Sequence, residues 1–228
     1  MIQRRRMSLF GRRSSRLLGV IAVAALAQDC APVIMHGPDV PGGFSGGVTA
    51  VLGRGPTYEN GDDPGPFYFG AAIASLAYGI RPDNGGLPSM RLGLQAPTGA
   101  ALGSDLYLQV PRKWLAPVAA GAGLLAEFPN GRQMPYLQVG VKNGGGFGLN
   151  AVVGSYASRR SYTGYWVRER AQVDWLTLEI PIADWASLYL HGGFASGHVV
   201  KQFNRDSTPY VDEDRWVTLG GLTLEFHR

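Results

Sequence analysis

The sequence has little cysteine, little charge and no long apolar run beyond its N-terminal region. Cys30 is the single cysteine among 228 residues, which excludes a disulfide framework and a cysteine-based zinc site. Charged residues make up 17% of the chain, but hydrophobic residues reach 45% and aromatic residues 11%, which is too apolar for a disordered chain. Without an apolar run of about 18 residues after residue 27, helical membrane spans are excluded.

Common catalytic and ligand-binding motifs are also absent. The chain contains no HExxH and no G-x-S-x-G, and its glycine-rich stretches lack the Lys-Ser/Thr of a phosphate loop. The sequence therefore predicts no metal, no cofactor and no enzymatic activity.

The net charge of +4 belongs to the N-terminal region. Residues 1–27 hold six of the 21 basic residues and no acidic residue, so the remainder has 15 basic against 17 acidic residues and a net charge of −2. A protein of this charge balance has no basic surface for nucleic acid, and we expect no nucleic-acid partner.

Residues 1–27 are predicted to be a secretory signal peptide. Six arginines precede an apolar stretch from Leu17 to Ala27, which at 11 residues is too short to cross a membrane. Ala25-Leu26-Ala27 has the small-x-small pattern of a cleavage site, so the mature chain is expected to start at Gln28.

Residues 28–43 are rich in proline and glycine and are predicted to form an extended periplasmic tether. Cys30 lies where the lipidated cysteine of a lipoprotein would lie, although Asp29 occupies the place of a small residue. Lipidation of Cys30 and an unmodified thiol on the tether are the two alternatives.

From residue 44 onward the dominant pattern is alternation, the signature of β-strands. In the last segment, Trp216, Leu222, Leu224 and Phe226 fall on one face, and Val217, Thr223 and Glu225 fall on the other. Ten residues separate Trp216 from Phe226, which in a tilted strand covers roughly 25 Å of the membrane normal. That distance matches the apolar band of a membrane barrel with an aromatic ring at each boundary.

The pattern predicts ten strands, an even number, as bacterial single-chain barrels have. The strands are expected at 44–54, 67–80, 88–96, 102–110, 118–128, 133–142, 146–158, 166–180, 187–200 and 214–226. Alternation fades in 118–128, so an eight-stranded barrel is the alternative. The long polar loops 55–66 and 201–213 are odd-numbered connections, which face outside when the N-terminus is periplasmic, and they are possible contact sites for an extracellular ligand.

A soluble β-sandwich shows similar alternation, but its polar face meets water and should be rich in lysine, glutamate and threonine. Here that face is rich in glycine and alanine, and residues 28–228 contain three lysines. The sequence thus favours an all-β, antiparallel up-and-down transmembrane barrel over residues 44–228. A secreted or lipid-anchored β-sandwich that binds a partner is the alternative.

On these features the chain resembles the small bacterial outer-membrane β-barrel proteins of the OmpA/OmpX-like size class. The resemblance implies residence in the outer membrane of Gram-negative bacteria, contact with outer-membrane lipids and insertion by the barrel-assembly machinery. It departs from the family where His227 and Arg228 follow the aromatic Phe226. The implied role is non-catalytic: envelope structure, surface interaction or limited, porin-like permeation.

The facing of the strands predicts two sets of site residues. A charge network that narrows the lumen is expected from Arg91, Asp105, Lys142, Glu179, His191 and Glu225. An aromatic girdle at the membrane boundaries is expected from Trp114, Trp166, Trp185, Trp216 and Phe226.

One outward-facing pair keeps a catalytic alternative open. Ser196 and His198 share the outward face of the strand at 187–200, where an outer-membrane lipid-modifying enzyme would carry such residues. Two polar residues at a strand end near the membrane boundary are the other interpretation.

Overall fold

The chain folds into a closed, ten-stranded antiparallel barrel, here described from a computed structural model. The structure describes residues 36–56, 66–83, 85–97, 102–128, 131–162, 165–203, 209 and 211–228. Residues 1–35 lie outside this range, so the signal peptide, its cleavage site and lipidation of Cys30 stay predictions. In the described part, no helix is long and apolar enough to cross a membrane.

The strands agree closely with the expected segments. They are β1 (Gly43–Pro56), β2 (Pro66–Ile80), β3 (Ser89–Pro97), β4 (Leu102–Gln109), β5 (Val118–Phe128), β6 (Gln133–Lys142), β7 (Gly148–Tyr162), β8 (Tyr165–Ala183), β9 (Ala186–Gln202) and β10 (Val211–His227). A single-turn helix, α2 (Arg112–Leu115), lies between β4 and β5. Ten strands are confirmed, and the eight-strand alternative is wrong.

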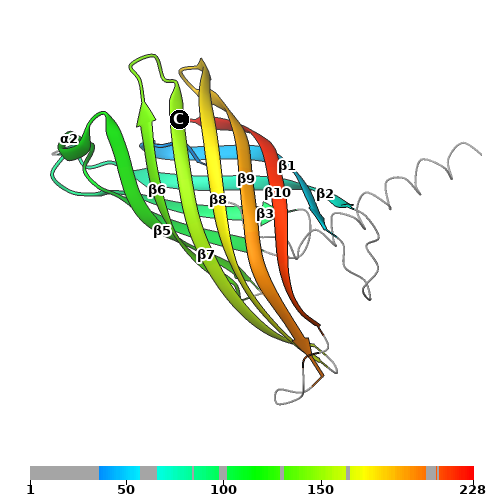
Figure 1. The fold of residues 1–228 in the computed structure, drawn as a ribbon. Helices are drawn as coiled ribbons and strands as arrows, with labels where there is room; N and C mark the ends of the chain where they lie inside the picture. The colour runs from blue at the N-terminus through cyan, green and yellow to red at the C-terminus, as the bar shows by residue number, and fades with distance from the viewer. Residues whose placement is uncertain are drawn as a thin grey trace, which may run out of the picture.

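Each strand pairs with the next, and β1 closes the barrel by pairing with β10 (Figure 1). The closing ladder aligns Val48 with Leu224 and Thr49 with Thr223. Because β1 begins and β10 ends at the same end of the barrel, we call this end the terminal rim and the opposite end the far rim. From the terminal rim to the Arg54–Thr218 pair, closure leaves no unpaired edge between β1 and β10, as a membrane interior requires. Nearer the far rim, β10 extends past β1, and β7 extends past β6.

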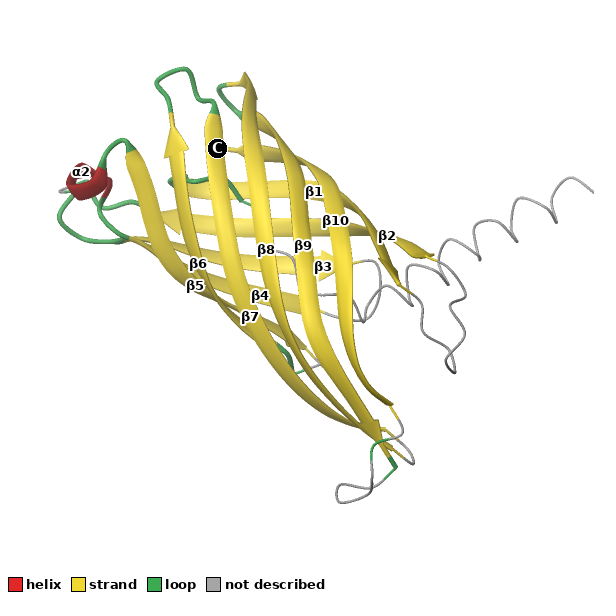
Figure 2. Ribbon diagram, in the orientation of Figure 1, coloured by secondary structure: helices red, strands yellow, loops and turns green. Residues whose placement is uncertain are grey.

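The barrel is taller on one side than on the other (Figure 2). Strands β7 to β10 contain 15 to 19 residues, whereas β3 to β6 contain 8 to 11. The long strands extend the sheet at the far rim.

The outer face is apolar and the inner face is more polar, the reverse of a soluble protein. On β4, Leu106 and Leu108 are exposed, while Asp105, Tyr107 and Gln109 are buried. Elsewhere Leu52 and Leu137 are 71% and 64% exposed. Exposure of such apolar side chains is unfavourable in water and favourable in lipid. The surface is therefore that of a transmembrane barrel, and the β-sandwich interpretation is wrong.

Two glycines explain why alternation fades in β5. The inward positions include Gly121 and Gly123, opposite which the neighbouring strands place the rings of Tyr107 and Tyr136. A Cβ atom at Gly123 would lie 2.1 Å from Cζ of Tyr136, and one at Gly121 would lie 2.5 Å from the hydroxyl of Tyr107. The small residues in β5 give room to large residues in β4 and β6.

We expect Gly123→Leu to destabilise the barrel by about 1–3 kcal/mol, because the added side chain must displace the ring of Tyr136. The matched control is Ala122→Leu, one residue away on the exposed outer face, where added apolar volume enters lipid. Unfolding of the purified protein in denaturant, followed by gel migration without boiling, measures both. Equal stability of the two variants would contradict the assigned facing of β5.

Candidate functional site

The interior of the barrel contains the chain's own N-terminal segment. Residues 36–42, which we call the inner segment, precede β1, and His36 and Val40 are only 3% and 1% exposed. The expectation of an extended periplasmic tether over residues 28–43 is thus wrong for this described part. The backbone of this segment bends at residues 38–39 and 42, and its carbonyl groups accept hydrogen bonds from donors inside the barrel.

Three amide side chains of the barrel wall hold three consecutive carbonyl oxygens of the inner segment. Asn150 Nδ2 on β7 donates to the oxygen of His36 at 3.3 Å. Gln138 Nε2 on β6 donates to the oxygen of Gly37 at 2.8 Å, and Gln109 Nε2 on β4 donates to the oxygen of Pro38 at 3.0 Å. These donors satisfy backbone groups that would otherwise be buried without a partner, and they fix the position of the segment along the lumen.

The side-chain carbonyl oxygen of Gln109 also binds the inner segment. The backbone N–H of Val40 donates to Gln109 Oε1 at 3.3 Å, so a single side chain holds both Pro38 and Val40. Nearer the terminal rim, Asp39 forms an ion pair with Arg112 of α2 at 2.5 Å. The inner segment is therefore anchored along its length by β4, β6, β7 and α2.

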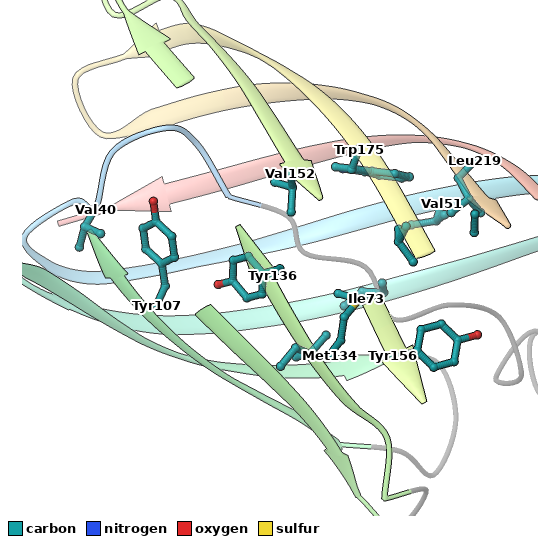
Figure 3. Packing of buried hydrophobic residues seen from close by; sticks show 13 residues of the cluster. Val40, Val51, Ile73, Tyr107, Met134, Tyr136, Val152, Tyr156, Trp175 and Leu219 are labelled. Carbon is teal, nitrogen blue, oxygen red and sulfur yellow. The ribbon is translucent and has the colours of Figure 1, made fainter. Parts of the chain in front are cut away.

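His36 lies against two tyrosine rings. Its ring centroid is 5.0 Å from that of Tyr107 and 6.3 Å from that of Tyr136, and His36 Nε2 is 3.4 Å from the Tyr136 hydroxyl. The two tyrosine rings are themselves stacked, with centroids 5.9 Å apart (Figure 3). This aromatic layer occupies the lumen between β4 and β6.

The aromatic layer leads to a buried ion pair. The Tyr136 hydroxyl donates to Asp105 Oδ1 at 2.8 Å, and Asp105 Oδ2 pairs with Arg91 on the adjacent strand β3. Both charged side chains are almost fully buried. A buried charge is costly unless it is paired and hydrogen-bonded, and here the carboxylate has both kinds of partner.

Three further predicted lumen residues, Lys142, Glu179 and Glu225, lie together away from the Arg91–Asp105 pair. Lys142 Nζ lies 2.5 Å from Glu179 Oε1, and Ser187 donates to the same oxygen at 3.3 Å. Glu225 accepts a hydrogen bond from the Tyr189 hydroxyl. The Tyr189 hydroxyl is also hydrogen-bonded to Ser187, so Lys142, Glu179 and Glu225 belong to one connected group, whereas Arg91 and Asp105 form a separate ion pair.

His191 lies in an uncharged cluster. Trp175 Nε1 donates to His191 Nδ1 at 3.2 Å, and Thr177 is 2.9 Å from the same nitrogen. Because an indole N–H can only donate, Nδ1 accepts and Nε2 carries the proton, which it donates to Thr223 at 2.8 Å. Thr223 in turn contacts Thr49 across the closing ladder at 2.7 Å.

The aromatic residues predicted for the girdle lie near both rims. At the terminal rim, Trp185 stacks on Phe226 with ring centroids 5.9 Å apart, and Trp114 is exposed in α2. Toward the far rim, Trp216 is exposed on β10, and Arg159 lies over the ring of Trp166 at 5.1 Å.

Sequence reasoning missed several lumen residues. Tyr107 and Tyr136 lie at inward positions of the alternating pattern, which is a signal that identifies them as lumen residues. His36 gives no such signal, because it lies in the proline- and glycine-rich residues 28–43. Arg132, which precedes β6, is 1% exposed and pairs with Glu127 at 3.6 Å and with Glu169 at 3.3 Å. Among the described residues, no group of three or more His, Cys, Asp or Glu side chains could hold a metal ion.

Comparison with known proteins finds similarity in fold alone. No protein-family model and no curated protein matches the chain. Among solved structures it is similar to an outer-membrane channel from Pseudomonas putida F1, at 12% identity and a TM-score of 0.45 over 85% of this chain and 100% of that chain. It is also similar to the NanC porin, at 9% identity and 0.43 over 77% and 98% of the two chains, and to the outer-membrane protease OmpT from Escherichia coli, at 10% and 0.40 over 85% and 98%.

Identities this low and TM-scores below 0.5 carry no argument about activity. The fold itself, an even-stranded closed barrel with an apolar outer face, is that of bacterial outer-membrane proteins. The resemblance expected from the sequence is confirmed at this level, and the protein is an outer-membrane β-barrel.

The buried pair Arg91–Asp105 gives a double-mutant prediction. We expect Asp105→Asn to cost about 3–5 kcal/mol, because it leaves the Arg91 guanidinium buried without its counter-charge. The double variant Arg91→Met with Asp105→Leu should recover most of this loss, since it removes both charges. Denaturant unfolding of the refolded barrel measures both; a double variant as unstable as Asp105→Asn would contradict the assignment.

His36 gives a pH prediction. Burial, together with the nearby positive charge of Arg91, lowers the pKa of His36 from 6.5 to about 4. The docked segment therefore prefers neutral His36: docking is fully stable above pH 6.5 and weakens as the pH falls toward 4. Hydrogen exchange of residues 36–42, corrected for intrinsic rates, should be faster at pH 5 than at pH 7.5. His36→Asn cannot titrate and should show no such difference.

Proposed function

We propose that this outer-membrane barrel is closed at rest and serves the envelope as a structural and surface-contact protein, with at most limited permeation. The observation that carries this proposal is the inner segment, held in the lumen by the amide groups of Gln109, Gln138 and Asn150. A lumen that carries dedicated donors for its own N-terminal segment is not arranged as an open pore.

The terminal rim supports closure. A cavity of about 410 Å³ opens there, and its lining includes Asp39 and Val40 of the inner segment together with Lys142 and Glu179. The pair between Lys142 and Glu179 and the pair between Asp39 and Arg112 both lie at this level. A solute that enters from the terminal rim meets paired charges and then the inner segment.

Large inward side chains support closure deeper in the barrel. A cluster of buried residues fills the interior, including Tyr107, Met134, Tyr136, Tyr156 and Trp175 (Figure 3). Ten strands enclose an interior only a little wider than that of an eight-stranded barrel, which side chains alone can fill. Release of the inner segment would therefore leave a narrow passage lined by aromatic rings, and not a wide channel.

The far rim supports surface contact. The longest strands, β8, β9 and β10, extend the sheet on this side and expose the polar side chains of Arg168, Arg170 and Gln172. Loops 55–66 and 201–213 are proposed from the sequence as ligand contact sites, and residues 57–65, 204–208 and 210 of these loops lie outside the described residues. The polar and cationic side chains on these extended strands are suited to contacts with polar or anionic groups.

Planar-bilayer recordings test closure. We expect the purified wild type to show no stable nanosiemens openings. The triple variant Gln109→Ala, Gln138→Ala and Asn150→Ala removes the three donors that hold the inner segment and should show small, sub-nanosiemens openings. A variant with three outward-facing substitutions, Leu106→Ala, Val139→Ala and Ala151→Gly, controls for loosening of the barrel. Large, stable openings in the wild type would overturn the proposal.

A further inference from the structure

Toward the far rim, the outer face of the barrel carries a mainly apolar groove that also contains polar side chains. Along the outward face of β9, Leu190 and Phe194 are followed by Ser196 and His198, all exposed. A groove of about 1190 Å³ lies over this part of the sheet and is lined by residues from β6 to β10. This groove lies outside the barrel and is separate from the lumen.

The sheet register aligns the polar residues of the groove in two adjacent rows. His198 on β9 pairs with Arg170 on β8 and with Asp214 on β10. Ser196, which lies two positions closer to the terminal rim on β9, pairs with Gln172 on β8 and with Trp216 on β10. Residues two apart on a strand share one face, so both rows face outward together.

A hydrogen bond orients the histidine. His198 Nδ1 lies 2.9 Å from Asp214 Oδ1. When the carboxylate accepts the proton on Nδ1, the neutral imidazole carries its basic lone pair on Nε2. This is the tautomer that a general base for a neighbouring hydroxyl needs, and the carboxylate stabilises the imidazolium that forms.

Ser196 is the neighbouring hydroxyl. It lies on the same face of β9 as His198, with about 6.6 Å of strand between the two Cα atoms. Hydrolysis requires rotation of both side chains until Ser196 Oγ lies within hydrogen-bond reach of His198 Nε2, a contact that is often long before substrate binds.

The position of the groove along the membrane normal indicates the class of substrate. Trp216, next to Ser196, is an exposed outward-facing tryptophan, a residue type that favours the boundary between hydrocarbon and headgroups. Toward the terminal rim the outer face turns apolar, with Phe194 on β9 and Leu222 on β10 both exposed. The acyl ester groups of membrane lipids lie at this same boundary, between the acyl chains and the headgroup.

We propose that Ser196, His198 and Asp214 form a lipid-facing hydrolytic site for acyl esters of membrane lipids. Ser196 Oγ attacks the ester carbonyl carbon while His198 Nε2 takes the hydroxyl proton. The carbon–oxygen bond to the lipid alcohol then breaks, and the proton passes from His198 to the departing oxygen, which leaves an acyl-serine. Water attacks this ester with His198 as base, releases the fatty acid and restores the serine hydroxyl.

Two residues on β8 complete the site. Gln172 pairs directly with Ser196, and its amide Nε2 donates to both carboxylate oxygens of Asp174, at 3.0 and 3.2 Å. We assign it to the oxyanion that forms on the ester oxygen. Arg170, opposite His198 and exposed, is placed to bind a lipid phosphate.

The proposed site lies on the outward face, so its activity is independent of closure of the lumen and of any conductance. It adds a catalytic surface to a barrel whose sequence favours a non-catalytic role. Asp214 is the residue that sequence reasoning missed, because its pairing with His198 exists only across the β9–β10 ladder.

The test uses the full-length protein purified from outer membranes in mild detergent. Fatty acid release is measured from mixed micelles of phosphatidylethanolamine and, separately, from lipopolysaccharide micelles, which tells the two lipid sources apart. We expect release from at least one, with a loss of at least 100-fold in Ser196→Ala and His198→Ala and of about 100- to 10,000-fold in Asp214→Asn. A fluorophosphonate probe should add its mass to the peptide that contains Ser196.

The matched control is Ser104→Ala, since Ser104 is also an exposed outward-facing serine but pairs with Leu94 and Ala126. It should keep full activity, and gel migration without boiling shows that each variant is folded. A folded wild type that releases no fatty acid and takes no probe would overturn the proposal. Release that persists in Ser196→Ala would overturn it equally.

Discussion

Pairing of β1 with β10 is the constraint on which the rest of the structure depends. In a bilayer no water can satisfy an unpaired backbone N–H or carbonyl group, so a sheet must close on itself. Closure at ten strands fixes the size of the interior, and the size of the interior decides which side chains can fill it. The two faces of the wall then have separate tasks: one meets lipid, and the other must pack.

The interior is packed by matching small residues on one strand with large residues on the next. Gly121 and Gly123 on β5 give room for Tyr107 and Tyr136, and these rings support His36 of the inner segment. Polar groups in this space have hydrogen-bond or ion-pair partners: the Tyr136 hydroxyl donates to Asp105, and Asp105 pairs with Arg91. A closed lumen therefore follows from satisfying buried polar groups as much as from filling volume.

On the outer face, the free-energy cost of a polar side chain depends on its position along the membrane normal. Leucines and valines dominate the outward positions between the rims, where the cost of a polar group in lipid is highest. Near the far rim that cost falls, and the outward positions carry Ser196, His198, Arg170 and Asp214. The long strands β7 to β10 carry the sheet through this boundary, so chemistry can be placed where lipid headgroups lie.

The sequence by itself determined the strands, their facing and the membrane surface. Alternation is a local property with a period of two, so Leu106 and Asp105 reveal their faces without knowledge of any partner strand. Even β5, where alternation fades, lies at the expected residues 118–128. The single-turn helix that carries Trp114 was not expected, since four residues give no periodic signal.

Only the tertiary structure decided which residues meet. The contact of Gln138 with Gly37 joins residues 101 positions apart, and the contact of His198 with Asp214 depends on the register between two strands. Proline and glycine in residues 36–42 predict an extended backbone equally well in the periplasm and in a lumen, because local conformation is the same in both places. What distinguishes the two is the presence of donors on three separate strands, and closure of the barrel is what brings those strands around one space.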